Sequence, residues 1–246
     1  MLDDRLPRRD LLRLAGFSTL SVGLAACGRV APAVQPAASA LPAHPSAEGT
    51  SASADEALAR LREGNQRFVA DKESNPNSSP ARRASIAASQ EPFATILGCV
   101  DSRVPPELIF DCGLGDLFVI RTAGHTLDHA VTGSIEFGAV ELKIPAILVL
   151  GHERCGAVKA TIEVLEGRAE ALSNIFVLVE AIAPAVEAAS TRPGDLLDNA
   201  VEINVTRTMA TLSQAPLLAP LIKEGKLKIA GAVYDLDTGV VRFLEG

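Results

Sequence analysis

The sequence has no tryptophan and only one tyrosine among its 246 residues. It also lacks any lysine and arginine cluster that would form a basic face, and its net charge is −7. Because binding to nucleic acid phosphates needs clustered cations, nucleic acid is excluded as a partner. The apolar run near the N-terminus, residues 14–26, is about 13 residues long. This is too short to cross a hydrocarbon core of about 30 Å as a helix.

The N-terminal segment 1–27 has the features of a bacterial export signal. Two adjacent arginines, Arg8 and Arg9, precede the apolar run, which ends in small residues and Cys27. Paired arginines resemble the twin-arginine export signal, and Leu-Ala-Ala-Cys resembles the lipobox, whose cysteine is lipidated. We therefore predict an exported protein of the periplasm or cell envelope that touches the membrane only through a lipid on Cys27. A simply cleaved signal, or an ordinary amphipathic helix, remains the alternative.

The rest of the chain divides into a linker and one domain. Residues 28–53 are mostly Ala, Pro, Ser and Val with almost no charge, a composition that cannot bury a core and predicts a flexible linker. From residue 54 to residue 246 the hydrophobic pattern is that of a globular domain.

Short apolar runs alternate with helical patterns along this domain. Strands are predicted at 93–98, 117–120, 146–150 and 227–233. Helices are predicted at 55–70, with an interruption at Gly64-Asn65, and at 81–89, 131–143, 156–166, 171–189 and 195–213. This order predicts a single α/β domain with a mainly parallel β-sheet flanked by helices.

Two of the predicted strands end in metal-binding residue types. Cys99 and Asp101 follow the first strand, and His152 and Cys155 follow the third. Reactive groups collect at the carboxyl ends of parallel strands, and two thiolates with an imidazole suit Zn²⁺. A helix beginning at Cys155 would stabilise its thiolate. Buried thiols, a Cys99–Cys155 disulfide, or a purely structural zinc site are alternatives that the spacing leaves open.

The segments Cys99-Val-Asp-Ser-Arg103 and His152-Glu-Arg-Cys155 resemble the C-x-D-x-R and H-x-x-C motifs of the β-class carbonic anhydrases. The likeness covers residues 55–246 and includes Asp235-Leu-Asp-Thr-Gly239. It implies the β-carbonic-anhydrase fold and a zinc ion held by Cys99, His152 and Cys155. The implied reaction is the reversible hydration of CO₂ to bicarbonate and a proton, through attack by a zinc-bound hydroxide.

The resemblance also assigns roles around the metal. Arg103 would keep Asp101 ionised, so that Asp101 accepts a hydrogen bond from the nucleophile. In some family members this Asp instead becomes the fourth zinc ligand in a closed state. Those members use a Trp-containing bicarbonate pocket, and this chain has no Trp, which favours the open state. The amide of Gly156 is a candidate contact for bicarbonate, with an ordinary helix-start glycine as the alternative.

Four further residues are assigned roles by position alone. Arg121 is expected to pair with Asp116 or to line a subunit interface. His125 and His129 are candidate proton relays, although each is more often a solvated or interface histidine. Cys112 is expected to be a buried apolar thiol.

The resemblance further implies a homodimer or homotetramer. Two other functions remain open. A carbonyl sulfide or carbon disulfide hydrolase would share the metal motifs. A non-catalytic zinc-binding lipoprotein would need neither Asp101 nor Arg103.

Overall fold

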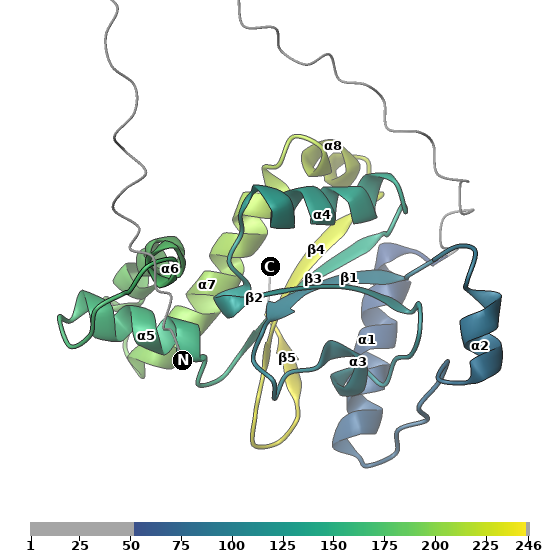
Figure 1. The fold of residues 1–246 in the computed structure, drawn as a ribbon, viewed down its shortest axis with the longest axis horizontal. Coiled ribbons are helices and arrows are strands. Elements are labelled where there is room, and N and C mark those ends of the chain that lie inside the picture. Colours follow the sequence, from purple (N-terminus) through teal and green to yellow (C-terminus); the bar gives the residue numbers. More distant parts are fainter. Residues whose placement is uncertain (1–51, 245–246) are drawn as a thin grey trace, which may run out of the picture. The chain divides into compact units, whose positions relative to one another are not determined.

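The computed structural model describes residues 52–244, which form one sheet with helices on both faces (Figure 1). The predicted export signal, and the linker up to residue 51, lie outside the described residues. The sheet has the order β2-β1-β3-β4-β5. The first four strands pair in parallel, and β5 is antiparallel to β4. The strands are β1 (Ala94–Cys99), β2 (Leu117–Thr122), β3 (Ala146–His152), β4 (Lys228–Tyr234) and β5 (Val241–Phe243).

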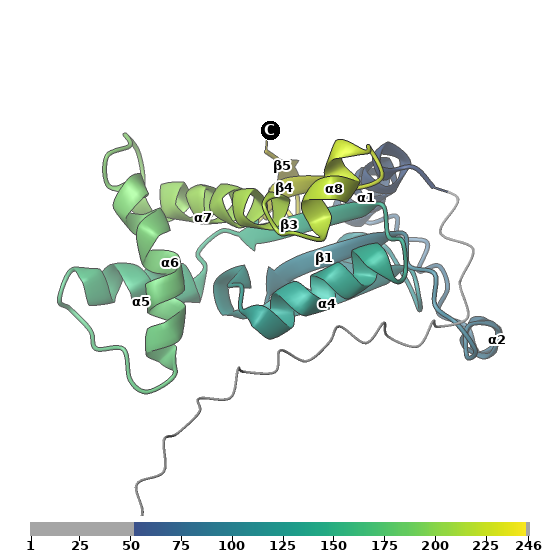
Figure 2. The same cartoon turned by 90° about the horizontal axis from the view of Figure 1, so that it is seen from above.

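The helices divide between the two faces of the sheet, as Figures 1 and 2 show. One core cluster contains α1 and α3 side chains, and the other contains side chains of α4 to α8. In Figure 2, α5 and α6 lie beyond the carboxyl ends of β1 and β3. The helices are α1 (Ala54–Val69), α2 (Pro80–Ser85), α3 (Pro106–Ile109), α4 (His129–Val140), α5 (Gly156–Leu165), α6 (Ile175–Ala189), α7 (Leu196–Ser213) and α8 (Leu218–Lys223), with a 3₁₀ turn η1 (Ala123–His125).

The two central strands are buried along their whole length. Every residue of β1 and β3 is buried, which explains why both read as continuous apolar runs rather than as alternating patterns. Helices cover both faces of these strands, so the carboxyl ends of β1 and β3 form a fixed edge of the sheet. The prediction of a single α/β domain with a mainly parallel sheet is confirmed.

The predicted interruption of the first helix at Gly64-Asn65 is wrong. Helix α1 continues through both residues because each makes a specific contact with a distant segment. A Cβ on Gly64 would lie 1.9 Å from the Phe110 carbonyl oxygen, so only glycine lets the two backbones approach. The buried Asn65 amide donates to Gly239 O at 2.8 Å, and its oxygen accepts from Val241 N at 2.8 Å.

A buried carboxylate joins α1 to the segment that follows α3. Asp111 accepts hydrogen bonds from Arg67, from Ser74 and from the Asn75 backbone. Burial raises the pKa of Asp111, but these hydrogen bonds outweigh it and leave the pKa at about 2. Asp111 is therefore ionised throughout the neutral range and holds the end of α1 in place.

Three short elements were not predicted from the sequence, namely α3, α8 and β5. Each has three to six residues, too few for a hydrophobic period to emerge. Among the described residues, no helix combines the length and the apolar character that crossing a membrane requires.

Candidate metal centre

The predicted metal ligands lie together at the carboxyl edge of the sheet. Cys99 is the last residue of β1, and His152 is the last residue of the neighbouring strand β3. Cys155 is the residue that precedes α5. Their ligand atoms all lie within 4.8 Å of one another, and all three residues are buried. The structure therefore brings the two halves of the motif into one site.

The histidine is oriented as a metal ligand. Its Nδ1 atom lies 2.8 Å from the Glu153 carbonyl oxygen, which suits an Nδ1–H donor. Its Nε2 atom is buried and has no hydrogen-bond partner among the residues described. An unpartnered buried nitrogen is unfavourable unless it binds something, and a backbone carbonyl on the other ring nitrogen is the usual support for a ligating His.

The two cysteines are free thiols rather than a disulfide. The pKa of Cys99 is lowered, first by the neighbouring Cys155 thiol, and then by the nearby His152 side chain and by a hydrogen bond from the Gly124 N–H. The pKa of Cys155 is raised, first because its thiol donates to Cys99 and then because it is buried. A metal bound here would hold both sulfurs as thiolates, so binding would release thiol protons. Two sulfurs and one nitrogen in a buried site match the ligand preference of Zn²⁺, so the residues fit this metal.

Asp101 and Arg103 form a bidentate pair beside the ligands. Arg103 Nη2 lies 2.7 Å from Asp101 Oδ2, and Arg103 Nε lies 3.0 Å from Asp101 Oδ1. The Arg103 backbone N–H donates to the same Oδ1 at 3.0 Å. These hydrogen bonds hold the pKa of Asp101 well below its usual range. Asp101 Oδ2 also lies 3.8 Å from His152 Nε2, so an ionised carboxylate faces the metal-binding atoms.

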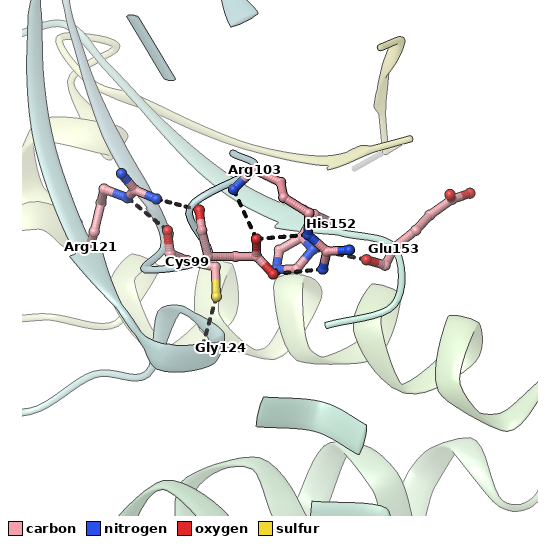
Figure 3. A network of polar contacts seen from close by, with 7 residues as sticks. Cys99, Arg103, Arg121, Gly124, His152 and Glu153 are labelled. Atoms are coloured by element: carbon pink, nitrogen blue, oxygen red, sulfur yellow. Dashed lines mark hydrogen bonds and ion pairs between the residues drawn. The ribbon is translucent and has the colours of Figure 1, made fainter. Parts of the chain in front are cut away.

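Arg121 has a different partner from the one predicted. Its guanidinium donates to Cys99 O at 2.7 Å and to Asp101 O at 2.6 Å (Figure 3). Asp116 instead accepts from the Asn77 side chain and the Gly113 backbone. Arg121 reaches Cys99 because it stands on β2, directly beside the end of β1. Arg121 therefore fixes the backbone of two residues, the metal ligand Cys99 and the carboxylate-bearing Asp101.

The three other residues assigned by position alone lie in different environments. His125 is 2% exposed, and burial lowers its pKa to about 4, so it is a neutral core residue rather than a solvated one. It lines a small cavity together with the three ligands. His129 is exposed at the start of α4. Cys112 is half-buried rather than buried, and burial raises the pKa of its thiol to about 12.

Gly156 begins α5 and is exposed next to Cys155. A Cβ on Gly156 would meet no atom within 4 Å in the described part of the chain. Packing therefore does not require glycine here, and contact between its amide and bicarbonate stays a prediction. Helix α5 begins directly after Cys155, which bears out the expected helix start, and the Cys155 side chain makes no capping hydrogen bond with the helix.

Two contacts at the site were missed from the sequence. The backbone N–H of Gly124, in η1, donates to Cys99 Sγ at 3.3 Å. The side-chain amide of Asn204, in α7, donates to the Gly124 carbonyl at 2.9 Å. One feature of the sequence could have pointed to Asn204. It is a polar residue on the buried face of α7, one turn from Ala200 and one turn from Thr208.

Known proteins share these motifs and this fold. The family model described as carbonic anhydrase matches residues 94–241. Carbonic anhydrase 2 of Mycobacterium tuberculosis is 43% identical over 180 residues, which cover 73% of this chain and 87% of the relative. A carbonic anhydrase of Mycolicibacterium smegmatis is 41% identical over 74% of this chain and 88% of its own.

Solved structures agree with the sequence relatives. The β-carbonic anhydrase CcaA superposes with a TM-score of 0.61 at 27% identity, over 77% of this chain and 95% of its own. The Coccomyxa β-carbonic anhydrase, solved in complex with acetazolamide, has a TM-score of 0.59 at 27% identity, over 76% and 84% of the two chains. The chain therefore belongs to the carbonic anhydrase family, and its fold and metal-binding motifs are those of the β class.

Proposed function

We propose that this chain catalyses the reversible hydration of carbon dioxide to bicarbonate and a proton, with zinc on Cys99, His152 and Cys155. One observation carries the proposal: a buried site with two sulfurs and one imidazole has an ionised carboxylate, Asp101, beside it. When bound there, zinc supplies the Lewis acidity that makes water a nucleophile near neutral pH. A purely structural zinc site would need no such carboxylate.

The surrounding residues position the reacting groups. Asp101 stays ionised because Arg103 donates two side-chain hydrogen bonds to it. It can then accept a hydrogen bond from the attacking water and turn the water's lone pair toward CO₂. Arg121 holds the carbonyl oxygens of Cys99 and Asp101, which fixes the distance between the ligand and the acceptor. The pairing of Asp101 with Arg103 supports an open site, with the carboxylate turned toward the arginine.

Stopped-flow measurement of CO₂ hydration on the zinc-loaded chain tests this function. We expect Asp101→Ala to retain zinc while losing most of the activity, since it removes the acceptor and no ligand. An inactive, zinc-loaded parent would refute the proposal. The same assay with carbonyl sulfide and carbon disulfide tests the alternative function as a hydrolase of these compounds. No contact among residues 52–244 specifically favours that alternative. The paired Asp101 likewise gives no support to a non-catalytic lipoprotein.

We also propose that the enzyme is exported and lipid-anchored at Cys27. The proposal is supported by Arg8 and Arg9, the apolar run and the lipobox-like end of the signal. A coil of the 26 residues in 28–53 would reach roughly 25–30 Å, enough to keep the domain beside the membrane. Arg8→Lys together with Arg9→Lys should leave active enzyme in the cytoplasm. Normal export of that double variant would contradict the twin-arginine assignment.

We further propose a homodimer or homotetramer. Strand β2 is an edge of the sheet, and an uncovered edge strand is an aggregation hazard unless a partner covers it. Large apolar side chains are exposed on the segment between β1 and β2, at Val100, Leu108 and Leu114. A chain from a structure report on two tetrameric β-carbonic anhydrases of Sordaria macrospora shares the fold at a TM-score of 0.61. Light scattering on the purified enzyme tests the assembly, and an active monomer would refute it.

A further inference from the structure

The sulfur of Cys99 accepts a hydrogen bond from a turn that is unusual in its backbone conformation. Two consecutive residues of this turn, Gly124 at φ 62° and His125 at φ 46°, lie in the left-handed region. This conformation aims the Gly124 N–H at Cys99 Sγ, 3.3 Å away, as Figure 3 shows. Because a non-glycine residue rarely adopts this conformation, something outside the turn must hold His125 there.

Asn204 contacts both residues of the turn from outside it, and within the turn the His125 Nδ1 atom also lies against the Gly124 carbonyl. The Nδ2 atom of Asn204 donates to Gly124 O at 2.9 Å and lies 3.1 Å from His125 Nδ1. Asn204 is 6% exposed, so water does not compete for these contacts. The carbonyl it holds belongs to the same residue, Gly124, whose N–H reaches the sulfur. The amide of Asn204 therefore fixes the orientation of the donor to Cys99.

The position of Asn204 is set by the close approach of α7 to the sheet. A Cβ on Gly151 would lie 2.7 Å from Val205, and a Cβ on Gly231 would also lie 2.7 Å from Val205. Glycine on β3 and on β4 therefore lets α7 pack directly on the strands, close to where β3 ends in His152. This packing leaves Asn204 little freedom to move away from the turn.

We propose that Asn204 is a positioning residue for the metal centre, which acts through Gly124 on the Cys99 sulfur. This inference rests on the zinc site proposed above. A hydrogen bond to a ligating sulfur fixes its direction toward the metal. Loss of one such supporting contact typically lowers metal affinity 10- to 100-fold.

Two variants of similar size test the proposal. Asn204→Asp and Asn204→Leu both remove the amide N–H donors, and we expect zinc affinity, measured by competition with a chelator, to fall about 10- to 100-fold. In the cobalt-substituted protein, the thiolate-to-metal charge-transfer band should shift in both variants. Thr208→Val is the matched control, because Thr208 is buried to a similar degree one turn along the same helix. It should leave affinity and spectrum as in the parent.

Unchanged affinity and an unchanged band in both Asn204 variants would overturn the inference. A parent that fails to bind zinc would instead refute the proposed function, so the two failures are distinguishable. If the variants fail to fold, a measurement on the parent protein still tests the inference. In the ¹¹³Cd-substituted parent, a scalar coupling between the metal and the Gly124 amide proton is expected across the N–H···S bond. Absence of that coupling would overturn the inference without any substitution.

Discussion

Replacement of Arg103 should reduce catalysis strongly while leaving the fold and the metal in place. In Arg103→Ala, Asp101 loses two side-chain hydrogen bonds, at 2.7 and 3.0 Å, and keeps only the one from the backbone N–H of residue 103. The carboxylate then rotates more freely and its pKa rises toward the ordinary value. Removal of one preorganised group beside a reacting centre typically lowers kcat by about 10²- to 10³-fold. Since one hydrogen bond remains, we expect a loss near 10²-fold.

The effect on stability should be small by comparison. The Arg103 side chain is 53% exposed, and exposed ion pairs contribute little to folding. The midpoint of thermal unfolding should therefore change by about 3 °C or less. Arg103→Lys adds a graded test, because lysine keeps the charge but cannot form the bidentate contact. Its activity should fall between those of the parent and the alanine variant.

A second ion pair of the same geometry provides the control. Arg154 contacts Asp237 through two bonds of 2.7 and 2.8 Å, and its side chain is 50% exposed. Asp237→Ala breaks this pair without touching a metal ligand or Asp101. Stopped-flow CO₂ hydration should detect little change in Asp237→Ala and a large loss in Arg103→Ala. If both variants lose activity equally, or if Arg103→Ala stays within a factor of two of the parent, the role of Arg103 is refuted.

Other consequences concern the metal, the anchor and acid stability. The parent should contain one zinc per chain by elemental analysis, and Cys99→Ser or His152→Ala should each empty the site; full retention of zinc in both would refute the ligand assignment. Cys27→Ser should release a soluble, active enzyme from cell membranes, and its continued recovery with the membrane fraction would contradict lipidation. Asp111→Asn should lower the free energy of unfolding at pH 7 by on the order of 2 kcal/mol. The pKa of Asp111, about 2, lies below its unfolded value, so its contribution is present above about pH 4 and lost toward pH 2. Denaturant titrations should show the two proteins converging over that interval.

The strands were predictable because most of them are uninterrupted apolar runs. β1 and β3 are buried on both faces, and such strands leave a strong signal in a single sequence. The predicted helix interruption at Gly64 and Asn65 was wrong because the conformation there depends on long-range contacts. Glycine and asparagine are poor helix formers, but contacts with Phe110 and Val241 from distant segments override that local preference. No local pattern contains this information.

The metal ligands were predictable for a related reason. Cys99 and His152 are the last residues of adjacent strands, so the order of the strands alone brings them together. The partner of Arg121 was not predictable, because a long guanidinium reaches many acceptors and the choice depends on side-chain placement. The contact of Asn204 with Gly124 spans 80 positions in the sequence and follows from how α7 packs on the sheet. Tertiary packing, rather than residue type, determines both the partner of Arg121 and the contact of Asn204.

The two halves of the metal site are held by different parts of the fold. The Cys99 half is fixed by Arg121 and by the Gly124 turn, which both follow β1 in the chain. The other half is fixed by the end of β4, because the Glu153 N–H donates to Tyr234 O at 3.0 Å. Each half is thus constrained without the metal, and zinc then joins two preformed segments. The entropy of ordering the ligands is largely lost on folding rather than on metal binding, and this favours tight binding.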